Sequence, residues 1–230
     1  MSHELMFRDG TWDRGIWEAV AVHNEYRLDG RFDPQDVVID VGAHIGSFTY
    51  AALDRGAGRV VAVEADPENA FVLRHNIHMA CGATDRCVIV TAAAWRSDSP
   101  EPLPVVRFER AGENTGGGGV GEEGFPVATV AFDRLVELAA GDGPVRLFKL
   151  DCEGSEWPIL FTSKRLGQVR EIVGEYHERE TEWGRCGAEK LREFLHAHGF
   201  TVEVQETRPG LGLFWAKREG VSGILRNPSA

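Results

Sequence analysis

Apolar runs and amphipathic stretches alternate along most of the chain. Five runs predict strands: 37–41 (VVIDV), 59–65 (RVVAVEA), 88–95 (VIVTAAAW), 144–154 (PVRLFKLDCEG) and 169–177 (VREIVGEYH). The first is a continuous run of mainly β-branched residues, which is typical of a strand buried on both faces. Segments with helical spacing lie between and after them, at 47–56, 67–80, 131–140, 155–163 and 188–200. Strands that alternate with helices of this length form βαβ units. We therefore predict an α/β fold, doubly wound around a mainly parallel sheet.

Three regions depart from this alternation. Residues 1–36 form an aromatic, partly helical extension, which we expect to cover a substrate pocket. Residues 97–124 hold three closely spaced prolines and the run GENTGGGGVGEEG, so we predict a mobile insertion with at most a short hairpin around VVRF. The last apolar runs, 200–206 and 211–218, predict a terminal antiparallel pair. One domain is expected over 37–217, followed by a tail at 218–230.

Composition and charge narrow the classes of partner. The chain of 230 residues has 25 Lys and Arg against 36 Asp and Glu, which gives a formal charge of −11. Phosphate backbones and anionic membranes favour a basic face, so we expect neither nucleic acid nor a membrane as partner. The N-terminus is too polar for a signal peptide, and no apolar run reaches the roughly 18 residues of a membrane span. We expect a cytoplasmic protein, and its four cysteines lack the C-x-x-C spacing of a zinc or redox site.

The sharpest chemical signal is a glycine turn after the first strand, DVGAHIG at 40–46. Gly42 and Gly46 let the backbone approach a ligand closely, and ligands of doubly wound sheets bind at this edge. The acid at the end of the next strand, Glu64, suits a ribose diol. These features predict a ribose-bearing ligand between the turn and Glu64, with Ala65 beside it.

The spacing of the turn distinguishes two classes of cofactor. A dinucleotide site needs G-x-G-x-x-G, but the bulky His44 fills the middle position here. Asp40, just before the turn, would repel a phosphate. A ligand with an ammonium, a sulfonium and a ribose fits better, and S-adenosylmethionine is such a ligand. Trp95, after the third strand, is a candidate contact for its adenine ring.

Charged side chains gather at the carboxyl ends of the fourth and fifth strands. Lys149, Asp151 and Glu153 alternate on one side of the fourth, and Glu175 and His177 share a face of the fifth. Such groups in a covered strand must be paired or lead into a site. Two interpretations stay open: His177 is a general base oriented by an acid, or, less favoured, Asp151, Glu175 and His177 bind a divalent metal. For Lys149, a structural ion pair is the alternative to a catalytic role.

With these residues located, the stretch from about Thr11 to Phe200 resembles the FkbM family of S-adenosylmethionine-dependent methyltransferases. The matching segments are NEYRL, DVGAHIGSFT, VVAVEADPENA, TVAFDRLV, LFKLDCEGSEWPIL and GEYHE. The resemblance implies a seven-stranded Rossmann-like fold and methyl transfer to oxygen on sugars or secondary metabolites. It assigns the ribose to Glu64 and the cofactor turn to Asp40, Gly42, Ala43, His44 and Gly46. Family members often have Asn or His at the position of His44, so the resemblance requires no catalytic role for it.

We therefore expect an S-adenosylmethionine-dependent methyltransferase that acts on a hydroxyl of a sugar or polyketide-like small molecule. Two alternatives stay open: a nicotinamide-dependent oxidoreductase and a non-catalytic S-adenosylmethionine-binding protein. Trp12, Trp17 and Tyr26 of the extension are equally suited to core packing and to the wall of a substrate pocket. The acceptor, the metal and the oligomeric state stay open, a homodimer being one alternative.

Overall fold

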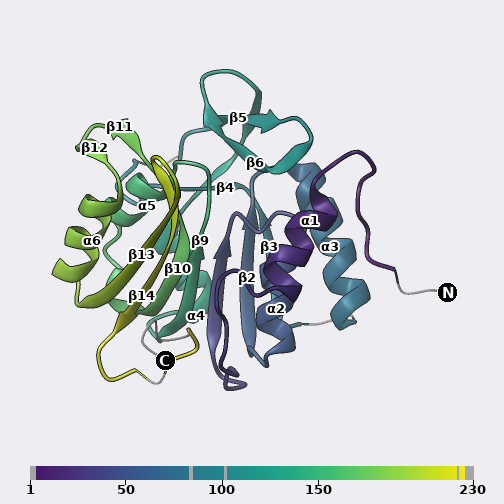
Figure 1. Cartoon of the computed structure of the whole chain (residues 1–230), viewed down its shortest axis with the longest axis horizontal. Coiled ribbons are helices and arrows are strands. Elements are labelled where there is room, and N and C mark those ends of the chain that lie inside the picture. Colours follow the sequence, from purple (N-terminus) through teal and green to yellow (C-terminus); the bar gives the residue numbers. More distant parts are fainter. Residues whose placement is uncertain (1–3, 83–84, 101–102, 222, 226–230) are drawn as a thin grey trace.

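A seven-stranded sheet forms the centre of the molecule, in the order β13–β14–β10–β9–β1–β2–β3 (Figure 1). The computed structural model describes residues 4–82, 85–100, 103–221 and 223–225. The strands of the sheet are Val37–Val41 (β1), Arg59–Glu64 (β2), Cys87–Thr91 (β3), Val145–Leu150 (β9), Val169–His177 (β10), Phe200–Arg208 (β13) and Leu211–Arg218 (β14). Strands β10, β9, β1, β2 and β3 pair in parallel, and β14 runs antiparallel to both of its neighbours. The predicted fold class and the terminal antiparallel pair are confirmed.

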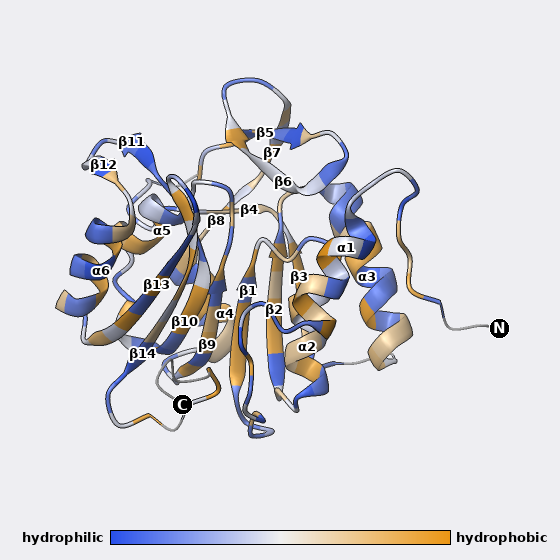
Figure 2. Cartoon of the chain, viewed as in Figure 1, coloured by the Kyte–Doolittle hydropathy of each residue, from blue (hydrophilic) through white to orange (hydrophobic). Residues whose placement is uncertain are grey.

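Helices cover both faces of this sheet, which explains why its central strands are apolar at successive positions (Figure 2). One face packs against α2 (Ser47–Asp54) and α3 (Pro67–Cys81). The other packs against α4 (Phe132–Ala140), α5 (Glu156–Thr162) and α6 (Ala188–Ala197). In β1, Val38 belongs to the first core and Ile39 to the second. Because successive side chains of a strand point to opposite faces, both cores need apolar residues from the same strand.

The order of the strands places a switch point between β1 and β9. From β1 the chain adds β2 and β3 on one side, and it then returns to place β9 and β10 on the other side. Ligands of doubly wound sheets bind at such a point, outside the carboxyl ends of the strands. In Figure 1 these ends lie at the top, below β5 and β6.

The N-terminal extension packs against the first face of the sheet. It contains α1 (Asp13–Trp17) and the π-helix η1 (Glu18–Val22), which lies against α2. The backbone N–H of Met6 donates to Asn76 Oδ1 of α3 at 2.7 Å. The indole N–H of Trp215 in β14 donates to the carbonyl of Tyr26 at 3.0 Å. The extension is therefore tied to both ends of this face.

Two predictions along the chain were wrong in detail. The predicted third strand, 88–95, divides: β3 ends at Thr91, and β4 (Ala93–Trp95) pairs instead with β8 (Thr129–Ala131). The insertion, expected as a loop with at most a short hairpin around VVRF, contains that hairpin as part of a three-stranded antiparallel sheet of β5 (Val106–Ala111), β6 (Asn114–Gly121) and β7 (Phe125–Val127). Its mobility stays a prediction. The remaining elements are η2 (Leu166–Gln168), a 3-10 helix, and the pair β11 (Arg179–Thr181) and β12 (Gly184–Cys186).

The prolines and glycines of the insertion are compatible with the strand pairing of β5, β6 and β7. Pro100 and Pro104 precede β5, and Pro126 lies in β7, which is one of the two outer strands. A proline is tolerated there because an edge strand leaves one side of its backbone unpaired. The glycines of β6 make room for an aromatic ring: a Cβ on Gly118 would lie 2.6 Å from Cζ of Phe108.

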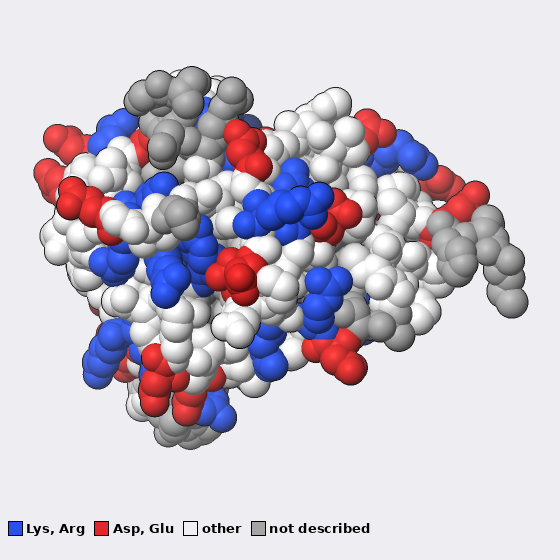
Figure 3. Space-filling view, turned by 90° about the horizontal axis from the view of Figure 1, so that it is seen from below, with Lys and Arg blue, Asp and Glu red and all other residues white. Residues whose placement is uncertain are grey.

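The two ends of the central sheet differ in character. At the amino ends of the parallel strands, Lys and Arg are interspersed with Asp and Glu on an outer face (Figure 3). The carboxyl ends carry the cavities described below. Among the helices of the described residues, none combines the length and apolarity that a bilayer crossing requires.

Candidate active site

The turn after β1 is held by backbone contacts that require glycine at its start. Gly42 has a φ of +75°, and a Cβ there would lie 1.7 Å from the carbonyl oxygen of Asp151, just after β9. The N–H groups of Gly42 and Ala43 both donate to the carbonyl of Val63 at 3.0 Å. Gly46, at φ +94°, packs instead against α3. The turn is therefore clamped between the ends of β2 and β9.

Glu64 closes the other side of the turn and is only 5% exposed. Its Oε2 accepts the N–H of His44 at 2.8 Å, and its Oε1 accepts the N–H of Asp66 at 2.8 Å and the amide of Asn69 at 3.4 Å. Burial raises the pKa of Glu64, and these hydrogen bonds oppose the rise. A carboxylate has about four lone-pair sites, so Oε2 keeps one for a ligand hydroxyl.

A narrow cavity of about 50 Å³ lies at this point, outside the ends of β1 and β2. Four of the predicted cofactor residues line it: Gly42, His44, Glu64 and Ala65. Its outer wall comes from β5 and β6. Trp95, the predicted adenine contact, is not part of the lining and lies in β4 opposite Ala131. The aromatic ring that reaches the cavity is that of Phe108, which is 6% exposed.

A second cavity of about 620 Å³ adjoins the first, beneath the N-terminal extension. One wall is apolar and contains Trp12, Ile16, Val20, Tyr26 and Phe48. The other is acidic and contains Glu25, Asp151, Glu153 and Glu175. The open question about the aromatic residues is thus answered residue by residue. Trp12 and Tyr26 line the cavity, whereas Trp17 is buried and stacks on Tyr50 with ring centroids 5.3 Å apart.

The two cavities have five lining residues in common, which we call the shared wall: Gly42, His44, Gly116, Asp151 and Glu153. A molecule in one cavity meets a molecule in the other at this wall. Asp151 is fixed there, because its Oδ2 accepts the hydroxyl of Tyr26 at 2.8 Å. The shared wall is therefore the place where the arrangement can support a reaction between two ligands.

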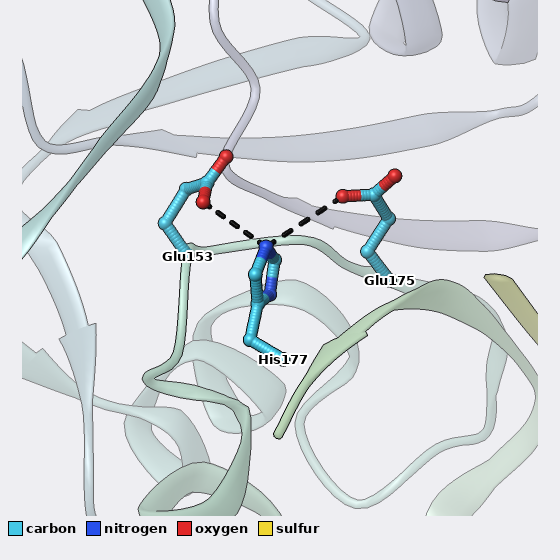
Figure 4. A group of neighbouring side chains, drawn as sticks. All are labelled: Glu153, Glu175 and His177. Atoms are coloured by element: carbon cyan, nitrogen blue, oxygen red, sulfur yellow. Dashed lines mark ion pairs between the residues drawn. The ribbon is translucent and has the colours of Figure 1, made fainter. Parts of the chain in front are cut away.

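His177 lies behind the shared wall, among three carboxylates. Its Nε2 is 3.0 Å from Glu153 Oε2 and 3.8 Å from Glu175 Oε2 (Figure 4), and its Nδ1 is 3.2 Å from Glu156 Oε1. Burial disfavours its charge, but the hydrogen bonds to Glu153 and Glu156 outweigh burial and raise the pKa of His177 to about 11. An imidazolium has no lone pair to accept a proton. This charge argues against His177 as the general base, and His177 lines neither cavity. Its role stays a prediction.

The acids around His177 differ in charge and position. Burial, reinforced by the nearby Asp151, raises the pKa of Glu175 to about 8, so Glu175 is mostly protonated at neutral pH. Within the described residues, the group with metal-ligand spacing is Glu153, Glu175 and His177, whose ligand atoms lie within 4.8 Å of one another. This set contains Glu153 where the sequence suggested Asp151. Metal binding stays a prediction.

Comparison with known proteins identifies the family of this fold and site. The profile of the methyltransferase FkbM domain matches residues 40–202, from the start of the cofactor turn to β13. The chain belongs to the FkbM methyltransferase family. No curated protein sequence matches it. The family membership argues against the oxidoreductase alternative.

One solved structure shows the same fold at low sequence identity. A methyltransferase FkbM from Methylobacillus flagellatus aligns with a TM-score of 0.56 and 15% identity over 87% of this chain and 47% of its own. This FkbM-family chain thus spans about half the length of that protein. Precorrin-6y C5,15-methyltransferase from Geobacter metallireducens has a TM-score of 0.45 and 16% identity over 94% and 92% of the two chains. Magnesium protoporphyrin IX methyltransferase from Synechocystis, solved with bound SAM, has a TM-score of 0.44 and 12% identity over 90% and 77%.

Two charged residues of this FkbM-family chain support the site from below. Asp40 is completely buried, lines neither cavity and accepts the hydroxyl of Thr49 at 2.6 Å. A direct contact of Asp40 with the cofactor stays a prediction. Lys149 is 3% exposed, and its Nζ donates to the carbonyls of Val41 and Gly42 at 3.2 and 2.7 Å. It also lies 3.5 Å from Asp40, in agreement with the structural alternative for this lysine.

Sequence reasoning missed residues that reach the site from distant parts of the chain. Asp13 of α1 and Thr115 of β6 meet His44, and Asn69 of α3 donates to the carbonyl of Thr115 at 2.9 Å. Phe108 lies in VVRF, where a short hairpin was expected, but its place in the cavity wall was not. Its alternation with charged neighbours in VRFER was the available signal, because period-two alternation predicts a half-buried strand.

Proposed function

We propose that this FkbM-family chain transfers the methyl group of S-adenosylmethionine to a hydroxyl of a sugar or secondary-metabolite acceptor. The observation that carries the proposal is the shared wall, where a cavity beside the cofactor turn opens onto a larger cavity with apolar and acidic sides. The first cavity lies beside the turn and Glu64, where a nucleoside would make its contacts, and the second falls within the usual range of a small-molecule pocket, about 300–1,000 Å³.

The residues of the first cavity fit the parts of S-adenosylmethionine. Glu64 keeps an acceptor site on Oε2 for a ribose hydroxyl. Phe108 and the alanines at 92–94 offer flat apolar surface for adenine. The cavity of about 50 Å³ is too narrow for a whole nucleoside, because β6 lies across it. Binding therefore requires β6 to move outward, in keeping with the expectation of a mobile insertion.

The second cavity suits an acceptor with both apolar and hydroxyl-bearing surface. Its aromatic wall packs against a ring, while Asp151 accepts and a protonated Glu175 donates hydrogen bonds to hydroxyls. When bound, S-adenosylmethionine supplies an activated methyl group, and as the acceptor oxygen bonds to the methyl carbon, the carbon–sulfur bond breaks with its electron pair on sulfur. The chain contributes alignment of the two ligands across the shared wall and removal of the hydroxyl proton.

The proposal is tested by cofactor binding followed by turnover. Calorimetry should show binding of S-adenosylhomocysteine but not of NADH, and Glu64→Gln should weaken it while the exposed Glu193→Gln should not. Wild-type protein is then incubated with methyl-labelled S-adenosylmethionine and a panel of monosaccharides and polyketide alcohols, with and without a chelator. Labelled methyl ethers support the proposal. Absent binding of S-adenosylhomocysteine overturns it, and binding with no turnover on any hydroxyl leaves the non-catalytic alternative.

A further inference from the structure

His44 has a nitrogen that nothing in the described structure uses. Its side chain is 8% exposed, and its Nδ1 is buried without a hydrogen-bond partner. The residue belongs to the shared wall, and a Cβ on Gly116 of the same wall would lie 4.0 Å from Nδ1. A buried polar atom without a partner costs stability, so it calls for a ligand or a chemical role.

The other ring nitrogen of His44 is fixed by a chain of contacts that begins at Arg8. The guanidinium and backbone N–H of Arg8 donate to both oxygens of Asp13 at 2.9–3.0 Å, and Asp13 is completely buried. Burial disfavours its charge, but hydrogen bonds from His44, Arg8 and Thr115 hold the pKa of Asp13 well below its usual range. Asp13 is therefore a carboxylate that only accepts.

The direction of the next two hydrogen bonds follows from that charge. The hydroxyl of Thr115 lies 2.6 Å from Asp13 Oδ1 and must donate its one proton there. Its oxygen lies 2.8 Å from Nε2 of His44, so it can only accept, and Nε2 must carry a hydrogen. Neutral His44 is consequently the Nε2–H tautomer, with the lone pair on Nδ1, the nitrogen at the shared wall.

We propose that His44 is the proton acceptor of the methyl transfer, with Asp13 and Thr115 as positioning residues. This inference rests on the proposed function. As the acceptor oxygen bonds to the methyl carbon, its hydroxyl proton moves to the Nδ1 lone pair, and His44 becomes an imidazolium that later releases the proton to water. Sulfur loses its positive charge in the transfer, and His44 gains one. The Asp13 carboxylate, whose Oδ1 lies 3.4 Å from Nε2, stabilises the charge on His44.

The acids of the shared wall are less suited to this role. Asp151 accepts the hydroxyl of Tyr26 and lies 3.5 Å from the ammonium of Lys149. Glu153 is paired with His177 at 3.0 Å. Both acids are therefore held by other side chains, whereas Nδ1 of His44 has no hydrogen-bond partner.

The first test is His44→Asn, because Asn tolerates the φ of +51° at this position and keeps hydrogen-bonding capacity without a basic nitrogen. With the acceptor that wild type methylates fastest, kcat should fall roughly 10²–10⁴-fold. The Kd of S-adenosylhomocysteine and the acceptor KM should stay within about twofold. His196→Asn, on the exposed side of α6, is the matched control. An unchanged kcat, or a loss confined to Kd or KM, overturns the proposal.

The second test needs no acceptor and reads the tautomer directly. In ¹⁵N NMR of the imidazole ring, assigned by comparison with His44→Asn, neutral His44 should carry its proton on Nε2. Thr115→Val should abolish that preference, lowering kcat while S-adenosylhomocysteine still binds. A wild-type Nδ1–H tautomer overturns the inference even if methyl transfer is demonstrated. Failure of wild type to bind S-adenosylhomocysteine instead overturns the proposed function and leaves the tautomer result standing.

Discussion

Lys149→Met is the substitution whose effect follows most directly from the contacts below the cofactor turn. Methionine keeps the length and apolar stem of lysine but removes the ammonium. The carbonyls of Val41 and Gly42 then lose their shared donor. The completely buried Asp40 carboxylate loses the cation 3.5 Å away and keeps the hydroxyl of Thr49.

The expected cost is large because the remaining charge is buried. Removing one partner of a buried ion pair typically destabilises a protein by about 3–5 kcal/mol. For a domain of this size, each kcal/mol of lost stability lowers the melting temperature by about 2–4 °C. The melting temperature of Lys149→Met should therefore fall by roughly 6–20 °C. Tyr26, whose ring centroid lies 5.7 Å from the ammonium, would lose a weaker interaction as well.

The pH dependence of this cost has a definite sign. Burial raises the pKa of Asp40, and the ammonium of Lys149 opposes the rise. Without Lys149 the pKa of Asp40 rises further, so the folded variant holds a proton that the unfolded chain has released. The free energy of unfolding of the variant should therefore fall, relative to wild type, as pH rises from about 4. The deficit should be smaller at pH 5 than at pH 8.

Urea unfolding at both pH values measures this free energy, with the exposed Lys164→Met as the matched control. Adding Asp40→Asn to Lys149→Met removes the uncompensated charge and should recover part of the loss. A deficit below about 1 kcal/mol at pH 8 would refute the reasoning, since that is the range of exposed ion pairs. The reasoning would also be refuted if the free-energy losses of the two single variants simply added in the double variant, because the two side chains would then not interact.

Four further predictions follow from the site. Glu64→Gln should weaken S-adenosylhomocysteine binding by about 1.5–3 kcal/mol, the scale of a hydrogen bond to a charged group; equal affinity in calorimetry would contradict the ribose assignment. The ion pairs of His177 contribute stability that is complete below about pH 6.5 and is lost as pH rises toward the folded pKa of about 11. The free energy of unfolding of wild type should therefore fall over that range, and that of His177→Gln should fall less. Equal pH dependence of the two proteins would argue against the pairing of His177 with Glu153 and Glu156. Gly42→Ala should lower the urea midpoint sharply, because its Cβ would lie 1.7 Å from a carbonyl oxygen, whereas Gly167→Ala, with nothing within 4 Å, should have little effect. Similar urea midpoints for the two variants would contradict the close packing of Gly42. Amides of 106–121 should exchange quickly in the free protein and slowly with S-adenosylhomocysteine bound, and strong protection without ligand would exclude outward movement of β6.

The sequence was sufficient for those features that depend on neighbouring residues. Strand β10 matches the predicted run 169–177, because β-branched residues fill both of its faces. The glycine turn and Glu64 were located from their spacing after two consecutive strands. Both lie at the predicted edge because parallel strands bring their carboxyl ends together.

The features that were missed depend on contacts between distant residues. His177 was expected to be a base because histidine is ordinarily neutral near pH 7, but Glu153 and Glu156, the first residue of α5, lie within 3.2 Å of its two ring nitrogens. No local pattern indicates that pairing. The extent of strand pairing in the insertion was underestimated because glycine content predicts flexibility, while the strand pairing of β6 depends on Phe108 filling the space that side chains would occupy.

The walls of the two cavities are joined by residues far apart along the chain, which has a consequence for the order of folding. Tyr26 and Asp151 are 125 residues apart, Asp13 and Thr115 are 102 apart, and Met6 and Asn76 are 70 apart. Closing such long loops costs entropy before the contacts form, and non-local contacts slow folding. In refolding we expect the central sheet to collapse first and the extension and insertion to dock afterwards. Ligand-binding capacity should then appear later than burial of Trp157 in the core of the central sheet, so a chain can complete that core and still lack a working site.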